Sequence, residues 1–209
     1  MSAVWTLLAG FALAAAAWAW ASRSIDGSAR VAIVAVLGVT AAAFNIVVPI
    51  PSIEATTTVV VCTSIALGAR TGIAAGLVAI IASSVTGGIG VWTVWMVVAV
   101  AVVACLGAIA SRLAGRVDWF TRRGALVLAL TSVLATLAWD IVTTAGSAAS
   151  YATQPGLTPM QQVVSALLLG AMFTVTHVAF TTAFTLVGGP PLLHALDRAR
   201  PRLAGGVIA

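Results

Sequence analysis

The chain has 209 residues, of which 61% are hydrophobic and only 7% are charged. Soluble domains carry roughly 25% charged residues, so this composition excludes an ordinary water-soluble domain. The net charge of +5 does not indicate a nucleic-acid-binding protein, because the arginines are scattered between apolar segments and form no patch. The composition predicts an all-α integral membrane protein, since about 20 apolar residues cross the hydrocarbon core as a helix.

Seven apolar segments follow one another along the chain. They cover about 3–21, 31–48, 54–69, 71–86, 92–113, 124–146 and 162–187. The turn from Gly68 to Gly72, around Arg70, is typical of a tight connection at a membrane surface. The first segment ends in Ala19-Trp20-Ala21, which is similar to a signal-peptide cleavage site, but no basic residue precedes its apolar run. We therefore expect this segment to be retained as a transmembrane helix.

The arginines predict the orientation in the membrane. With seven spans, every arginine falls in a connection on the same side, namely Arg23, Arg30, Arg70, Arg112, Arg116, Arg122, Arg123, Arg198, Arg200 and Arg202. The positive-inside rule makes that side cytoplasmic, with the N-terminus outside and the C-terminus inside. The outer connections, 49–54, 87–92 and 147–160, are nearly uncharged.

Two polar residues lie near the first outer connection, and each has a structural and a functional interpretation. Asn45 could bind a solute, or it could form a helix–helix hydrogen bond or cap its helix before Pro49. Glu54 could contact a ligand, or it could lie in the first turn of a helix that Ser52 caps.

Two titratable residues lie inside the last two segments. Asp140 is the only acid well within an apolar segment, so it should face a cavity or a polar partner such as a serine, a threonine or His177. We expect His177 to be a satisfied interior histidine, because no second histidine or cysteine at ligand spacing accompanies it. The sequence therefore predicts no metal site.

Aromatic and small residues give weaker signals. Trp92 and Trp95 are typical of an interfacial aromatic belt, but the preceding glycine-rich stretch 87–91 could also let them close over a flat solute. Pairs of small residues four positions apart, such as Gly72 with Gly76 and Ala75 with Ala79, would let a neighbouring helix approach closely. No Gly-Lys phosphate loop, HExxH motif or serine nucleophile elbow is present in the sequence, so we predict no enzyme activity and no cofactor.

Two stretches resemble a known family. The run from Thr57 to Gly76 resembles the helix 2–3 hairpin of S components, the substrate-binding subunits of energy-coupling factor (ECF) vitamin transporters. The stretch from Ala82 to Met96 is similar to their helix 3–4 outer loop. Its Trp-Thr-Val-Trp element, 92–95, is most similar to the cobalamin-type subgroup. The resemblance covers about residues 31–190.

The resemblance implies a fold and a set of partners. It implies a six-helix substrate-binding membrane domain over 30–197, preceded by an extra transmembrane helix and linker over 1–29 and followed by a cytoplasmic tail over 198–209. The bound vitamin would be cobalamin or a related corrinoid, although riboflavin, thiamine or a queuosine precursor stays open. A separate module of one membrane protein and two ATPases would drive uptake across the bacterial cell membrane.

The resemblance also implies which residues act. The expected substrate-binding residues are Asn45, Glu54, Trp92, Trp95, Trp139 and Asp140. Small residues on the segment 31–48 would dock the energy-coupling module, and the candidates are Ala32, Ala35, Gly38 and Ala42, without a strict Ala-xxx-Ala motif. Two other functions stay open. One is a self-standing facilitator or channel, and the other is a membrane enzyme acting on lipid or prenyl groups through Asp140 and His177.

Overall fold

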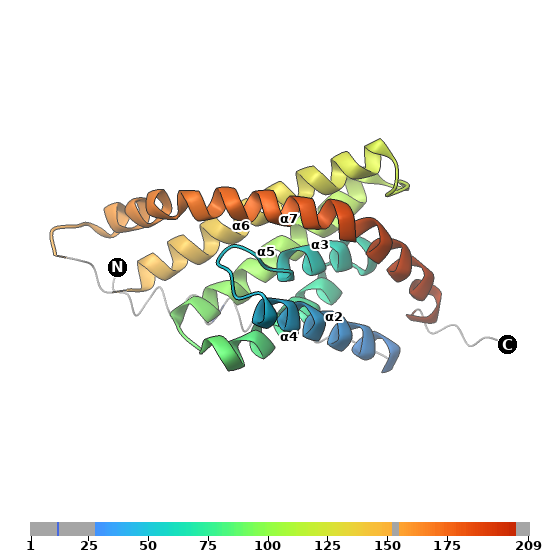
Figure 1. The fold of residues 1–209 in the computed structure, drawn as a ribbon, viewed down its shortest axis with the longest axis horizontal. Helices are drawn as coiled ribbons and strands as arrows, with labels where there is room; N and C mark the ends of the chain where they lie inside the picture. The colour runs from blue at the N-terminus through green and yellow to red at the C-terminus, as the bar shows by residue number, and fades with distance from the viewer. Residues whose placement is uncertain (1–11, 13–27, 152–154, 204–209) are drawn as a thin grey trace.

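The computed structural model describes residues 12, 28–151 and 155–203, and this part of the chain is all-helical. Its helices are α2 (Ser28–Val47), α3 (Thr56–Leu67), α4 (Ala69–Gly87), α5 (Val91–Ala114), α6 (Arg122–Ser150) and α7 (Pro159–Leu203). Each matches one predicted segment from 31–48 onward, while the predicted first segment, 3–21, lies outside the described residues except for residue 12. Five helices, all but α3, are long and apolar enough to cross a membrane. The helices pack side by side as a bundle (Figure 1).

Helix α3 is the short central helix of the bundle. Its 12 residues span about 18 Å, which is less than the roughly 30 Å of the hydrocarbon core. Every residue from Thr56 to Ala66 is buried, because α2, α4, α5, α6 and α7 all pack against this helix. Its buried surface includes four threonines and a serine, so the centre of the bundle is unusually polar.

Glycines bring the helices around α3 into close contact. A Cβ added at Gly72 would lie 1.9 Å from the Ser64 hydroxyl, and one added at Gly76 would lie 2.6 Å from the Val100 side chain. These distances leave no room for a methyl group, so the close approach predicted for this pair of small residues is confirmed. Ala75 and Ala79 are also fully buried, in the contact with α2.

Helix α7 runs much further than the sequence predicts. The predicted segment ends at residue 187 because two glycines and two prolines, 188–191, follow it, yet the helix continues to Leu203. Its C-terminal part turns away from the direction of the rest (Figure 1), as expected where proline removes a backbone N–H. Leu193 and Leu196 are buried in the core, and this packing holds the helix together beyond the prolines. The predicted boundary between 197 and 198 falls inside this helix, and the cytoplasmic location of the tail stays a prediction.

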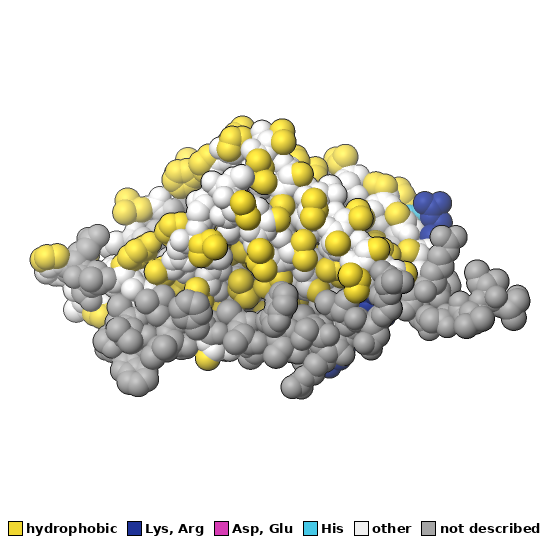
Figure 2. Space-filling model, turned by 90° about the horizontal axis from the view of Figure 1, so that it is seen from below, with side chains coloured by type: hydrophobic (Ala, Val, Ile, Leu, Met, Phe, Trp, Pro, Cys, Tyr) yellow, Lys and Arg dark blue, Asp and Glu magenta, His cyan; other side chains and the backbone are white. Residues whose placement is uncertain are grey.

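The surface separates apolar and basic side chains. Large hydrophobic side chains are exposed along α2, α4, α6 and α7, and Figure 2 shows how they cover one face of the molecule. Arginines from four helices line one cavity at the α3–α4 turn. We call this the arginine end, and the opposite end, which carries the connections 48–55 and 88–90, the loop end. An apolar belt with charges gathered at one end is what a helical membrane bundle requires.

A candidate solute site at the loop end

A cavity of about 500 Å³ opens at the loop end of the bundle. It lies between the connection before α3, the end of α4, the start of α5 and the middle of α6 and α7. The side chains that matter most for its chemistry are Asn45, Glu54, Trp92, Trp139, Asp140 and His177. Four of these side chains are polar or titratable, and they converge on one wall of a cavity that is otherwise largely apolar.

The centre of that wall is a carboxylate–histidine–carboxylate cluster. Nδ1 of His177 lies 2.8 Å from Oδ1 of Asp140, and Nε2 lies 3.2 Å from Oε1 of Glu54. The histidine side chain is only 5% exposed, and the two carboxylates are 17% and 18% exposed. Both contacts are satisfied together when the ring is doubly protonated, and the cluster then carries a net charge of −1.

One carboxylate oxygen remains available in this cluster. Oδ2 of Asp140 is buried and has no hydrogen-bond partner among the described residues. A buried carboxylate oxygen without a partner is costly, so it favours a donor or a positive group beside it. Among the partners that the sequence left open for Asp140, the structure places His177 beside it, whereas no pattern in the sequence indicated the contact of the same ring with Glu54.

Glu54 also binds the start of α3 from the connection that precedes it. Both of its carboxylate oxygens accept from the backbone N–H of Thr57, at 3.0 and 3.1 Å. The interpretation in which Ser52 caps the helix and Glu54 lies in its first turn does not hold, because the helix begins at Thr56 and its N-cap is Ala55, while Ser52 has a φ of +66° in the preceding turn. Burial alone raises the pKa of Glu54, but the hydrogen bond and charge of His177 together with the Thr57 N–H hold it below its ordinary value.

Asn45 has the structural role that the sequence left open. Its Oδ1 accepts from the backbone N–H of Ala55 at 3.0 Å, and its Nδ2 donates to the Thr56 hydroxyl at 2.9 Å. The side chain thereby ties the end of α2 to the start of α3 across the connection. Asn45 lines the cavity as well, so it holds the loop that carries Glu54 and also contributes to the wall.

A row of buried hydroxyl-bearing residues from α3, α6 and α7, which we call the polar seam, continues from the cluster into the bundle. One helical turn below Asp140 and His177 lie Thr136 and Thr181, both fully buried with unpartnered hydroxyls. One turn further, Thr185 of α7 hydrogen-bonds to Thr58 of α3 at 2.8 Å and to Ser132 of α6 at 3.3 Å.

Three helices therefore contribute residues at matching depths, with the charged cluster at the cavity and hydroxyl groups beneath it. Of the four threonines of α3, Thr58 belongs to this seam.

The three candidate tryptophans have different environments. Trp139 is 6% exposed and Trp92 is 44% exposed, and both line the cavity. Trp92 folds back over Gly90, where a Cβ would lie only 2.4 Å from the indole ring. Trp95 is not among the residues that line this cavity, and its role in substrate binding stays a prediction. Its indole N–H donates to the buried Ser150 hydroxyl at 2.9 Å, so the side chain joins α5 to α6 away from the cavity.

The four candidate docking residues on α2 divide into two pairs. Gly38 and Ala42 are buried, and a Cβ at Gly38 would lie 2.5 Å from Val78 of α4. Gly38 thus serves the internal contact between α2 and α4, and both residues are covered within the chain, while the docking role of the four residues stays a prediction. Ala32 and Ala35 are exposed, beside the exposed side chains of Val36 and Val39.

The cluster does not form a metal site. Within the described residues, no group of three histidine, cysteine, aspartate or glutamate side chains could hold a metal ion. The reason is geometric, because the two carboxylates contact opposite nitrogens of the same ring. A single metal ion would bind only one of those nitrogens, so it could not take all three side chains as ligands.

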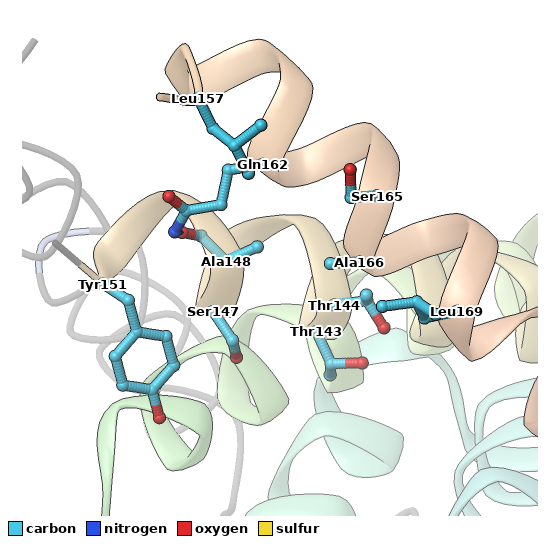
Figure 3. Close-up of a pocket in the computed structure, with 10 residues that line it drawn as sticks. All are labelled: Thr143, Thr144, Ser147, Ala148, Tyr151, Leu157, Gln162, Ser165, Ala166 and Leu169. Carbon is cyan, nitrogen blue, oxygen red and sulfur yellow. The ribbon is translucent and has the colours of Figure 1, made fainter. Parts of the chain in front are cut away.

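A second cavity of about 560 Å³ lies between the loop-end parts of α6 and α7. Figure 3 shows the hydroxyls of Thr143, Ser147 and Ser165 and the ring of Tyr151 around it. Gln162 closes part of it, since its Nε2 donates to the Ala148 carbonyl at 2.8 Å. Among the described residues that line this cavity there is no carboxylate or histidine, which distinguishes it from the first one. The chain matches no family model, no curated protein and no solved structure in our comparisons.

Proposed function

We propose that this chain is the substrate-specificity subunit of an ECF-type importer and that it binds a vitamin in the loop-end cavity. The observation that carries the proposal is the position of the Glu54–His177–Asp140 cluster at the floor of that cavity, at the opposite end from the arginines. Titratable groups inside a membrane bundle are costly and are typical of solute sites. If the arginine end is cytoplasmic, the cavity faces outward, where a solute to be imported is captured.

The cavity favours a particular class of solute. Its walls combine Trp92, Trp139 and aliphatic side chains with acceptor oxygens, and ligand sites generally combine apolar walls with a few placed polar groups. The free Oδ2 of Asp140 and the net negative charge of the cluster favour a solute with N–H or O–H donors or a cationic group. A volume of about 500 Å³ is large enough for a thiamine-sized solute, whereas a corrinoid would extend beyond it.

A binding assay with a vitamin panel tests this function. The purified chain would be incubated with labelled cobalamin, thiamine, riboflavin and a deazapurine queuosine precursor, and any ligand retained from expression would be identified by mass spectrometry. We expect high-affinity binding of one of them without ATP. Absence of binding to every member, together with no co-purification of an energy-coupling module, would overturn the proposal. Solute flux in liposomes without any ATPase would instead support a self-standing facilitator.

The assumed orientation has its own test. Single cysteines at Gly88 and at Arg116, in a chain whose Cys62 and Cys105 are replaced, would be labelled in intact cells with a membrane-impermeant maleimide. We expect labelling at position 88 and protection at position 116. The reverse pattern would place the cavity in the cytoplasm and remove the uptake role.

A further inference from the structure

The loop-end cavity carries more negative than positive charge. Its titratable lining residues are Glu54, Asp140 and His177, and the described residues that line it include no arginine or lysine. The two nitrogens of His177 contact one carboxylate each, at 2.8 and 3.2 Å. Two carboxylates and one imidazolium sum to one negative charge, and this sum is unchanged if a proton of the ring moves to a carboxylate.

Internal contacts compensate the charge of Glu54 more fully than that of Asp140. The Glu54 carboxylate has two partners, Nε2 of His177 and the backbone N–H of Thr57, and both of its oxygens take part. The Asp140 carboxylate has only Nδ1 of His177, beside Oδ1, while Oδ2 has no partner among the described residues. The uncompensated charge therefore lies mainly on Asp140, whose side chain borders the cavity and is 18% exposed.

Helix dipoles do not reverse this charge. Helices α3 and α5 begin at the cavity, whereas α2 and α4 end there, so two positive helix ends oppose two negative ones. The first turn of α3 is also already occupied, because the Thr57 N–H donates to Glu54. The side chains therefore decide the sign of the field inside the cavity.

Several side-chain donors that an anion would need are engaged within the protein. Both nitrogens of His177 contact carboxylates. Nδ2 of Asn45 donates to the Thr56 hydroxyl at 2.9 Å, and the Ser83 hydroxyl donates to a carbonyl of its own helix at 2.8 Å. A phosphate or carboxylate bound here would lie near Asp140 without an arginine or lysine of the cavity to pair with, so the cavity should repel it.

The aromatic walls suit a cation as well. Trp92 and Trp139 line the same cavity, and Trp139 directly precedes Asp140 in α6. The face of an indole ring attracts a positive charge, and this attraction is strongest where water is largely excluded. A flat cationic ring would therefore find both an aromatic surface and a carboxylate in this cavity.

We propose that the loop-end cavity selects an organic cation, a solute with a positively charged nitrogen heterocycle or ammonium group, and that it excludes the phosphate ester of the same solute. Asp140 is the residue that determines this selectivity. The inference rests on the proposed function, because it names the chemical class of the solute that the site would capture. It divides the vitamins that stay open, since thiamine carries a permanent positive charge and riboflavin carries none.

Matched solutes measured on the unmodified full-length chain test the selectivity first. Binding of thiamine would be compared with binding of thiamine monophosphate, and binding of aminomethyl-deazaguanine with binding of its uncharged cyano analogue. Riboflavin and cyanocobalamin complete the panel as solutes without a net positive charge, and isothermal titration calorimetry measures each dissociation constant. We expect the tightest ligand to be one of the two cations, with its matched analogue bound at least about tenfold more weakly.

The variant Asp140→Asn then tests the residue, because it removes the charge and nearly preserves the shape of the side chain. Affinity for the cation should fall by about tenfold or more, while affinity for its analogue should change by less than about threefold. The matched control is Asp197→Asn, which removes a half-exposed carboxylate that does not line this cavity and should change neither affinity by more than about twofold. The comparison of solutes needs no variant, so it still decides the question if Asp140→Asn does not fold.

The outcomes separate this proposal from the function on which it rests. Tightest binding of a neutral solute or of the phosphate ester would overturn the charge selectivity and leave the vitamin-binding function standing. Equal losses of cation affinity in the two variants would overturn the role of Asp140. Binding of no member of the panel would overturn the proposed function, and this inference with it.

Discussion

Nδ1 of His177 lies 2.8 Å from Oδ1 of Asp140, and this contact joins the middle of α7 to the middle of α6 beside the loop-end cavity. The opposite nitrogen of the same ring reaches Glu54 in the connection before α3. One imidazole therefore ties three parts of the chain together, so it contributes to stability as well as to the proposed site.

Replacing His177 by alanine should destabilise the protein. The change leaves the Glu54 and Asp140 carboxylates partly buried and without their common partner, which should cost about 2 kcal/mol. Thermal unfolding in detergent, followed by tryptophan fluorescence, measures the loss. The control is His194→Ala, because this second histidine is exposed and packs edge-to-face with the Phe120 ring. Equal shifts in both variants would contradict a special role for the cluster.

Stability should fall in acid because of Glu54. Its pKa in the folded protein lies below the ordinary value of 4.5, so its contribution is complete above that value and is lost as pH falls through the folded pKa. Glu54→Gln should remove this part of the pH dependence, whereas the unmodified chain should keep it. Unfolding midpoints measured from neutral pH to about pH 3 decide between them. A glutamine variant with the full acid sensitivity would show that other carboxyl groups cause it.

Gly146 should not tolerate even a methyl group. A Cβ at this position would lie 2.1 Å from the Trp95 indole, so Gly146→Ala should push α5 and α6 apart and cost about 1–3 kcal/mol. Gly170→Ala is the matched control, because nothing lies within 4 Å of a Cβ there and alanine favours a helix. The measurement is the shift in unfolding temperature. A control that loses as much stability would point to helix flexibility rather than to the indole contact.

The hydroxyls of the polar seam should differ in what they contribute. Thr136→Val and Thr181→Val remove buried hydroxyls that have no partner, so stability should stay the same or rise. Thr185→Val breaks the hydrogen bonds to Thr58 and Ser132, and it should cost about 1 kcal/mol. Unfolding temperatures of the three variants test this. A large loss for Thr136→Val would indicate an ordered water that binds its hydroxyl.

A bulky residue on the exposed face of α2 should separate binding from transport. We expect Ala35→Trp to prevent co-purification with the energy-coupling module while solute affinity stays within about twofold. Val187→Trp places the same side chain at another exposed position, on α7, and should leave both properties unchanged. Loss of affinity in Ala35→Trp would show that the residue acts on the fold of the bundle instead.

The positions of the helices could be predicted from the sequence, because each apolar segment is bounded by glycine, proline or arginine. The end of α7 could not, since glycines and prolines at 188–191 signal a break that packing of Leu193 and Leu196 overrides. The sequence also could not predict that α3 is short and buried on all sides, because composition identifies an apolar segment but not the helices that pack around it.

Part of the candidate site could also be predicted from the sequence. Asp140 and His177 lie at similar depths in consecutive antiparallel segments, so their contact could be expected. Glu54 could not be assigned to the same ring, because its position depends on how Asn45 holds the connection before α3. Trp92 and Trp95 are three residues apart in sequence, and only the packing against Gly146 distinguishes the core residue from the cavity residue.

The length of α3 has a consequence for how the chain enters a bilayer. Twelve residues rich in threonine are too short and too polar to partition into lipid as an independent span. A single residue, Gly68, separates this helix from α4, so the two could leave the insertion machinery only as one unit. We expect α3 to reach its final position late in biogenesis, once the later helices arrive to shield it from the lipid chains.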